Sequence, residues 1–147
     1  MHVGLAFIDL DTFKAVNDTM GHVFGDELLI SYAEKFSSSL RIKDSFTARF
    51  GGDEFAIFWP MIDREGNNAP LEGFQNHVLQ INEEFVLEHP EVTEVIPSFG
   101  MCAGFISTLD GYTDAKSMLE AGDKKMYEKK RVSKASRNNP TNDQVIN

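Results

Sequence analysis

Four carboxylates stand at two places where apolar runs meet polar residues. Asp9 and Asp11 lie at the end of HVGLAFIDLD, and Asp53 and Glu54 lie inside ARFGGDEFAIFW. If the two runs form neighbouring strands, Asp9 and Asp53 converge at one edge of a sheet. Converging carboxylates without a basic partner repel each other, so the pair needs a cation or a shared proton. Oxygen ligands favour a hard ion, Mg2+ or Mn2+, that completes its shell with phosphate oxygens. The alternative is that these acids only cap a helix and polarise a turn.

Two glycines precede the second pair of acids, and a lysine follows the first. Gly51 and Gly52 would serve a turn that needs positive φ, or their missing Cβ atoms would let a phosphate or base lie on the backbone. A helix beginning near Thr12 would offer its free N–H groups to an anion at the same edge. Lys14 would add a cationic donor there.

A purine could be recognised close by. Asn17 and Asp26 supply an amide and a carboxylate, and a carboxylate accepts from the N1–H and the exocyclic amine of guanine. The alternative interpretation is that each is a helix cap or a surface residue.

The elements that position these residues are predicted from hydrophobic periodicity and turn residues. In chain order they are a buried strand at 2–10, a helix at 11–18 with Asp11 or Thr12 as N-cap, a helix at 26–40, strands at 45–50 and 54–59 joined as a hairpin, a surface loop at 60–73, a helix from 71 to about 89, a strand at 92–106 broken by Pro97, and a helix at 113–131. This order predicts an α/β (α+β) fold, a single layer of mainly antiparallel sheet with helices packed around it.

Length and composition indicate one globular domain. The chain has 147 residues, of which 41% are apolar and 25% charged. This is enough to bury a core without stabilisation by disulfides or a metal. The single cysteine, Cys102, excludes an internal disulfide and is expected to be a small buried core residue. No apolar run is long enough for a membrane span, and no signal peptide precedes Val3. We therefore expect a cytoplasmic domain without membrane contact of its own, whose parent chain could still be membrane-anchored.

The charge distribution is uneven. A net charge of −9 argues against general nucleic-acid binding, because contact with backbone phosphates needs a basic face. Seven of the fourteen Lys and Arg residues nevertheless lie between Lys124 and Arg137. This cluster is either a solvated helix end that complements the macrodipole or a phosphate contact.

The motifs resemble a known family. FIDLDTFKAVNDTMGHVFGDELL followed by ARFGGDEFAIF closely resembles the GGDEF domains, diguanylate cyclases, whose signature is D-x-D-x-F-K-x-x-N-D-x-x-G-H-x-x-G-D and then R-x-G-G-D-E-F. SFG at residues 98–100 and AGDKKMYEKK at 121–130 are also similar to family motifs. The resemblance implies a nucleotidyl-cyclase or palm-like sheet. It places the domain at 1–131, without the segment and helix that usually precede the first strand, and leaves 132–147 as a polar flexible tail.

The resemblance also implies a role for each matching residue. Asp9, Asp53 and the backbone carbonyl of Leu10 match the ligands of Mg2+ or Mn2+. Asp53 matches the general base towards the ribose 3′-hydroxyl, and Glu54 assists at the metal. Lys14 matches the residue that stabilises phosphoryl charge as pyrophosphate departs.

Further matches concern the substrate. The positions implied for substrate binding are Phe13, Asn17, His22, Asp26, Gly51, Gly52 and Lys130. Among them, Asn17 and Asp26 match the guanine readers. His22 matches a position near the nucleotide, or is a structural residue bonded to a loop carbonyl. Arg49 and Lys130 match basic positions near the phosphates or the hairpin.

The implied activity is the condensation of two GTP molecules into cyclic di-GMP and two pyrophosphates. Because the product has two equivalent links, each subunit would hold half a site in a two-fold homodimer, regulated by an upstream sensor domain. One alternative is a catalytically inactive GGDEF-type domain that binds GTP or cyclic di-GMP as a regulatory module. Another is a dimerisation module whose acids are solvated turns.

Two positions depart from the family pattern. Many relatives carry an inhibitory R-x-x-D site, but here Asp44 of Arg41-Ile42-Lys43-Asp44 stands one residue farther from Gly51 than the pattern expects. An ordinary surface pair is therefore the alternative to product inhibition through Arg41 and Asp44. Lys134 replaces an expected arginine and so lacks bidentate phosphate geometry.

Overall fold

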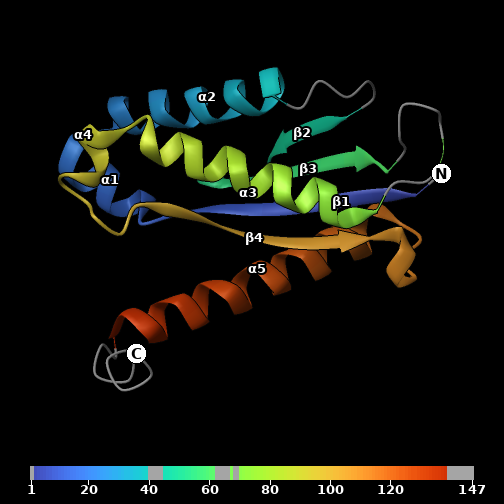
Figure 1. The fold of residues 1–147 in the computed structure, drawn as a ribbon. Helices are drawn as coiled ribbons and strands as arrows, with labels where there is room; N and C mark the ends of the chain where they lie inside the picture. Colours follow the sequence, from blue (N-terminus) through green and yellow to red (C-terminus); the bar gives the residue numbers. More distant parts are fainter. Residues whose placement is uncertain (1, 40–44, 62–66, 68–69, 139–147) are drawn as a thin grey trace.

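One antiparallel sheet organises the computed structural model, which describes residues 2–39, 45–61, 67 and 70–138 (Figure 1). The elements are β1 Val3–Asp11, α1 Phe13–Met20, α2 His22–Ser39, β2 Phe46–Arg49, β3 Glu54–Pro60, α3 Leu71–Leu87, α4 Pro90–Thr93, β4 Gly100–Ser107, the short 3-10 helix η1 Thr108–Asp110 and α5 Ala115–Asn138. The strand order is β2-β3-β1-β4, and every pairing is antiparallel. The predicted single-layer α/β (α+β) architecture is confirmed.

The register of the sheet brings the acidic segments together. β1 is buried from Gly4 onward because it lies between two strands and between two layers of helices. Its Asp9 pairs with Glu54 of β3 on one side and with Cys102 of β4 on the other. The first strand therefore does lie beside the hairpin, as the convergence of Asp9 and Asp53 requires.

Helices cover the two faces of the sheet unequally. Figure 1 shows α2 and α3 on one side and α5 on the other. The larger core lies under α1, α2 and α3 and is rich in aromatic rings, with Tyr32 in edge-to-face contact with Phe36, Phe55 and Phe85. The smaller core under α5 comprises Leu5, Phe7, Ala56, Ile106, Met118 and Met126. Aromatic edge-to-face packing adds to the stabilisation from buried area.

Two glycines let α5 approach the sheet closely. A Cβ on Gly104 of β4 would lie 2.5 Å from the backbone oxygen of Gly122 and 2.5 Å from the backbone nitrogen of Met126. A Cβ on Gly122 would lie 3.1 Å from the Cβ of Phe7. The position of α5 over β1 and β4 therefore depends on the absence of side chains at these contacts.

The structure corrects several predicted boundaries. Residues 92–99 are not a strand, because Pro90 starts the short helix α4 and β4 begins only at Gly100. α2 begins at His22 rather than at residue 26. α5 continues to Asn138, past the predicted end at residue 131. Thr12 precedes α1 as predicted, but its side chain makes no capping hydrogen bond, and its φ is 65°.

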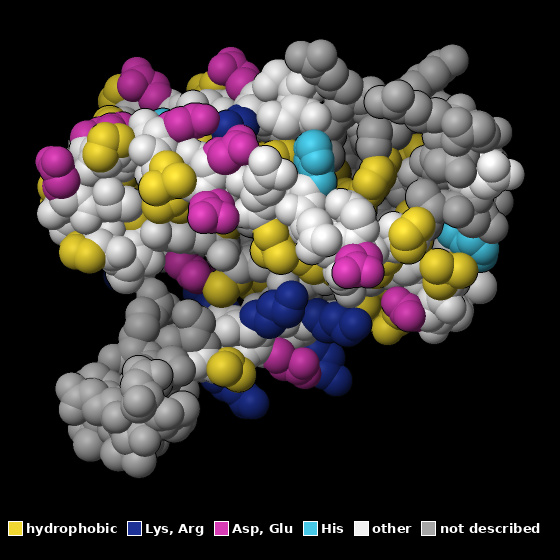
Figure 2. Space-filling model, viewed as in Figure 1, with side chains coloured by type: hydrophobic (Ala, Val, Ile, Leu, Met, Phe, Trp, Pro, Cys, Tyr) yellow, Lys and Arg dark blue, Asp and Glu magenta, His cyan; other side chains and the backbone are white. Residues whose placement is uncertain are grey.

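Basic and acidic side chains gather on different layers of helices. Figure 2 shows Lys and Arg side chains gathered along α5, whereas Asp and Glu side chains predominate over the helices above the sheet. Lys35 of α2 forms ion pairs with Glu84 and Glu88, which tie α2 to the C-terminal end of α3 and the residue after it. Within the described ranges, no helix has both the length and the apolar character needed to cross a membrane.

Candidate active site

Backbone hydrogen bonds fix the hairpin connection beside the end of β1. The N–H of Leu10 donates to the carbonyl of Asp53 at 3.1 Å, and the N–H of Phe50 donates to the carbonyl of Glu54 at 2.9 Å. Arg49 braces the same connection, since its Nε donates to the carbonyl of Gly51 at 3.1 Å and its Nη2 to that of Gly52 at 2.7 Å. Of the two locations predicted for Arg49, the structure places it on the hairpin.

The paired glycines are not required by turn geometry. Neither Gly51 nor Gly52 has a positive φ. A Cβ on Gly52 would meet no atom within 4 Å, whereas one on Gly51 would lie 3.3 Å from Oε2 of Glu54. The backbone at Gly52 thus faces open space, where a ligand can lie directly against it.

Asp9 is the most strongly perturbed carboxyl at this edge. It is 6% exposed, and its Oδ1 has no hydrogen-bond partner. Burial raises the pKa of Asp9 to about 6, the hydrogen bond from Lys130 opposes that rise, and the neighbouring carboxyl of Asp53 adds to it. Asp9 and Asp53 therefore meet, as the sequence predicts. Burial also raises the pKa of Glu54, and the charges of Asp123 and Asp53 act in the same direction.

Lys130 of α5 is the basic partner of this acidic edge. Its Nζ donates to Oδ2 of Asp9 at 2.7 Å and lies 3.8 Å from Oδ1 of Asp11. Burial acts to lower the pKa of Lys130, but the hydrogen bond to Asp9 and the charges of Asp9, Asp11 and Asp53 outweigh burial and raise it. Sequence reasoning placed Lys130 near phosphates or the hairpin and missed this contact.

Asp11 and Cys102 form a second contact that the sequence did not predict. The Cys102 thiol donates to Oδ2 of Asp11 at 3.0 Å. Burial raises the pKa of Cys102 to about 12, with the hydrogen bond to Asp11 adding to the shift. Cys102 is therefore a half-buried neutral donor rather than a nucleophile. Asp11 is buried at the strand end and does not cap α1.

Two cavities meet at Lys130. The larger, about 470 Å³, is lined by Leu10, Asp11, Thr12, Phe13, Lys14, Ala15, Asp18, Asp53 and Lys130. The smaller, about 320 Å³, is lined by Asp9, Glu54, Asp123, Met126, Tyr127, Lys130 and Arg131. The first turn of α1 therefore borders the larger cavity together with the exposed Lys14. Free N–H groups at a helix start and a lysine suit an anion such as a phosphate chain.

The predicted guanine readers lie at the contact between α1 and α2. Asn17 packs so closely on Gly25 that a Cβ there would lie 1.9 Å from Oδ1 of Asn17. That oxygen is buried and has no hydrogen-bond partner. Asp26 follows Gly25 and is exposed, as is His22.

Phe13 plays a structural part, and other predicted residues cannot be placed. The Phe13 side chain belongs to the larger core and is 8% exposed, although the residue also borders the larger cavity. Arg41 and Asp44 lie outside the described residues, as does the side chain of Lys134.

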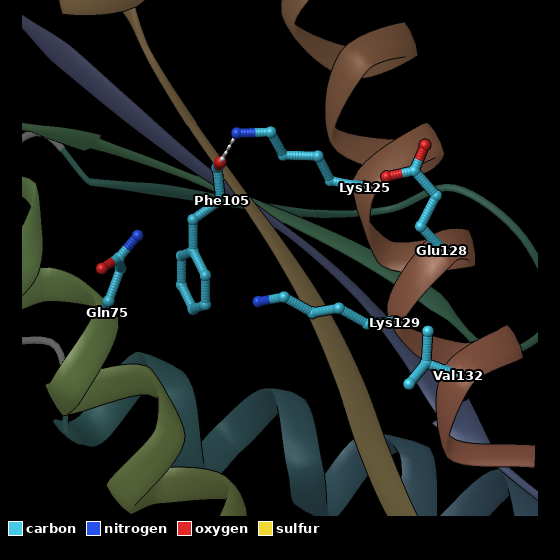
Figure 3. A pocket seen from close by; sticks show the side chains of 6 residues that line it. All are labelled: Gln75, Phe105, Lys125, Glu128, Lys129 and Val132. Carbon is cyan, nitrogen blue, oxygen red and sulfur yellow. Dashed lines mark hydrogen bonds between the residues drawn. The ribbon is translucent and has the colours of Figure 1, made fainter. Parts of the chain in front are cut away.

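A separate cavity lies away from these residues. It measures about 590 Å³ and is lined by Gln75, Phe105, Lys125, Glu128, Lys129 and Val132 (Figure 3). Lys125 donates to the carbonyl of Phe105 at 3.4 Å, and Lys129 lies 5.2 Å from the centre of the Phe105 ring. None of the predicted site residues lines it.

The donor set fits a divalent ion that shares its shell with a substrate. Among the described residues, no group of three or more His, Cys, Asp or Glu side chains is arranged to hold a metal. Asp9 and Asp53 supply two carboxylates, one with an unpaired buried oxygen, and Leu10 and Asp53 both line the cavity bordered by the first turn of α1. Mg2+ characteristically takes one or two carboxylates and completes its shell with water and phosphate oxygens.

Comparisons with known proteins agree on one family. The sequence model described as "Diguanylate cyclase, GGDEF domain" matches residues 1–136. Diguanylate cyclase DgcP of Pseudomonas aeruginosa is 31% identical over 128 residues, which are 87% of this chain and 18% of that protein. Diguanylate cyclase DgcP of Escherichia coli K12 is 34% identical over 128 residues, which are 86% of this chain and 35% of that protein. The chain thus spans a minor part of either relative's length.

Solved structures show the same fold. The active GGEEF domain of a diguanylate cyclase from Vibrio cholerae matches with a TM-score of 0.73 and 32% identity, over 89% of this chain and 78% of that chain. The GGDEF domain of DgcB from Caulobacter crescentus, in complex with c-di-GMP, matches with a TM-score of 0.65 and 24% identity, over 88% of this chain and 72% of that chain. At the second identity the likeness concerns the fold alone.

Proposed function

The chain belongs to the GGDEF family of diguanylate cyclase domains, and from that membership we propose that it condenses two GTP molecules into cyclic di-GMP and two pyrophosphates. The observation that carries this proposal is the contact between Asp9 and Asp53, of which Asp53 lines the cavity that α1 and Lys14 border. Acidic ligands, helix N–H groups and a lysine around one cavity suit a nucleoside triphosphate.

The guanine base would lie between α1 and α2. Asn17 carries an unpaired amide oxygen, and Asp26 is exposed on the adjacent helix. An amide oxygen and a carboxylate accept from the N1–H and exocyclic amine of guanine, which adenine does not present in the same arrangement. The exposed His22 would contact the nucleotide from the start of α2.

The phosphate chain would lie along the first turn of α1. Lys14 and the free N–H groups there would compensate its negative charge, and the open backbone at Gly52 would admit the nucleotide. Asp9, Asp53 and the carbonyl of Leu10 would hold Mg2+ or Mn2+. Such an ion neutralises phosphate charge and acts as a Lewis acid at phosphoryl oxygens.

In the reaction, Asp53 would accept the proton of a ribose 3′-hydroxyl. The freed oxygen forms a bond to the α-phosphorus of the other GTP, and the bond from that phosphorus to the bridging oxygen of pyrophosphate breaks. Lys14 would stabilise the charge that develops on the phosphoryl oxygens. Glu54, whose pKa burial raises, would assist beside Asp53. The same step, in which the 3′-hydroxyl of the second GTP attacks the α-phosphorus of the first, closes the ring.

The partner in catalysis would be a second copy of the chain. One subunit offers one set of guanine readers and one base, so two subunits related by a two-fold axis would face their GTP molecules towards each other. An upstream sensor domain is proposed as regulator, because the matched relatives are much longer than this chain. We also propose that the domain lies in the cytoplasm, where GTP is available.

Incubation with GTP and Mg2+ tests this function directly. We expect cyclic di-GMP and pyrophosphate in a ratio of one to two, and none from Asp53→Ala. GTP binding without product would instead support an inactive domain that acts as a regulatory module. A protein that binds neither GTP nor cyclic di-GMP would support a dimerisation module.

A further inference from the structure

Lys130 is hydrogen-bonded to a carboxylate oxygen of Asp9 that an incoming metal ion would need as a ligand. Its Nζ lies 2.7 Å from Oδ2 of Asp9, while Oδ1 of Asp9 has no partner. The Asp9 side chain is 8% exposed and that of Lys130 is 24% exposed, so the pair is shielded from water. A buried carboxylate left without a counter-ion is strongly destabilising, and Lys130 removes that cost.

Lys130 also lies where it can leave Asp9 without crossing the core. It borders both the cavity that contains Asp9 and Glu54 and the cavity formed by the first turn of α1. The lysine side chain is a compact charge on a flexible four-carbon stem, which allows such a change of partner. The phosphate chain of the proposed substrate would lie in the second cavity.

We propose that Lys130 is a built-in counter-ion that holds Asp9 and Asp11 until metal and nucleotide bind together, and then transfers to the phosphate chain. The proposal rests on the proposed function for the identity of the nucleotide. In the free protein Lys130 competes with the metal for Asp9. Nucleotide phosphates draw Lys130 away, so the nucleotide strengthens metal binding.

The coupling must be reciprocal. If nucleotide strengthens metal binding by a given factor, metal strengthens nucleotide binding by the same factor. Couplings of this kind are typically about 5-fold to 150-fold in affinity. Lys130 is therefore a positioning residue that favours the binding of metal and nucleotide together and weakens the binding of metal alone.

The test measures Mn2+ binding by electron paramagnetic resonance, without and with α,β-methylene-GTP, which cannot be cyclised. In the natural protein we expect the nucleotide to raise Mn2+ affinity at least about fivefold. In Lys130→Met we expect Mn2+ affinity without nucleotide to rise at least about fivefold, and the nucleotide to add less. Lys124→Met on the exposed face of α5 is the matched control and should behave as the natural protein.

A structural role alone would not produce tighter metal binding. If Lys130→Met retains its circular dichroism spectrum and binds Mn2+ no more tightly than the natural protein, the proposal is wrong. Acetylation of the natural protein followed by peptide mass spectrometry gives a second readout that needs no variant. Mn2+ alone, at a concentration that saturates the site and so displaces Lys130 from Asp9, should increase the labelling of Lys130 severalfold relative to Lys124. Unchanged labelling under these conditions contradicts the exchange.

The outcome is separable from that of the proposed function. A chain that makes no cyclic di-GMP, but whose Lys130→Met variant binds Mn2+ more tightly, supports the counter-ion and contradicts the reaction. A chain that makes cyclic di-GMP, but whose variant leaves Mn2+ affinity unchanged, supports the reaction and contradicts the counter-ion.

Discussion

Gly25 and Gly52 lack a side chain for different physical reasons. Gly25 is buried in α2 against Asn17, whereas Gly52 is exposed in the hairpin connection. An added methyl group therefore meets protein at the first position and only the proposed substrate at the second. Substitution at Gly25 therefore acts through a displaced protein side chain, whereas substitution at Gly52 acts on the substrate directly.

At Gly25, alanine should displace Asn17 at a moderate cost in stability. The new Cβ would lie 1.9 Å from Oδ1 of Asn17, so that side chain must rotate. Overpacking costs about 1–3 kcal/mol, and alanine returns about 1 kcal/mol through helix propensity. We expect Gly25→Ala to lower GTP affinity about tenfold while the free energy of unfolding falls by about 2 kcal/mol at most. Calorimetric GTP titration and urea unfolding measure both, and undiminished affinity would exclude Asn17 as a base reader.

At Gly52, alanine should leave folding unchanged and impair the reaction. No atom lies within 4 Å of the added Cβ, and the backbone φ there is not positive. The free energy of unfolding should change by less than about 0.5 kcal/mol. We expect Gly52→Ala to lower the rate of cyclic di-GMP formation at least about tenfold, because the methyl group would occupy the space of the nucleotide. Normal activity would mean that the substrate does not approach this backbone.

At the scale of elements, the seat of α5 on β4 determines where Lys130 lies. Alanine at Gly104 would place Cβ 2.5 Å from backbone atoms of α5, which cannot rotate aside as a side chain can. We expect Gly104→Ala to lower the free energy of unfolding by about 3 kcal/mol and to weaken nucleotide binding. The control is Gly73→Ala at an exposed position of α3, where an added Cβ would meet no atom within 4 Å. This variant should be neutral or slightly stabilising. Equal stability of the two variants in urea would contradict the close seat of α5.

The ion pairs between α2 and α3 give a pH-dependent prediction. The hydrogen bond to Glu88 is the main cause that raises the pKa of Lys35, so the charged form is favoured in the folded state. A group whose pKa rises on folding stabilises below its unfolded pKa and loses that effect as pH rises through the folded pKa. Because both glutamates are largely exposed, Lys35→Met should cost only about 0.5–1 kcal/mol at neutral pH. In urea unfolding the difference should be lost as pH rises through the raised pKa of Lys35, and a pH-independent difference would indicate lost packing instead.

Local patterns predict local structure and contacts between neighbouring strands. The meeting of Asp9 and Asp53 could be predicted, because antiparallel β1 and β3 place the end of one beside the start of the other. The strand predicted across 92–99 was wrong because β-branched residues outweighed Pro90, whose fixed φ suits the first turn of a helix. Its absence shortens β4 without moving Cys102 from its place opposite Asp9.

The contacts made by α5 could not be predicted from the amino-acid sequence. Lys130 is 121 positions from Asp9, and a basic helix end predicts solvent or phosphate equally well. Its contact depends on the depth at which Gly104 and Gly122 let the helix sit, which only packing decides. The thiol donor of Cys102 to Asp11 was missed for the same reason, since burial alone predicts a core residue.

At the scale of the whole molecule, the two-fold product requires two competent subunits. In the proposed reaction both 3′-hydroxyls must be activated, one by each subunit, so a dimer with one Asp53→Ala subunit should form at most one of the two bonds. Such a mixed dimer should yield linear pppGpG rather than cyclic di-GMP. The rate of cyclic product should then follow the square of the fraction of natural subunits.

Mixing the natural protein with Asp53→Ala at constant total concentration distinguishes paired from independent action. At equal amounts we expect about one quarter of the full rate if dimers mix at random, against about one half if each subunit acts alone. Chromatography of the products should show pppGpG rising as the variant is added. Lys124→Met, which changes an exposed residue outside the two cavities at the site, is the control partner and should preserve the full rate. A linear dependence on the natural fraction would place the entire reaction within one subunit and would contradict the proposed homodimer.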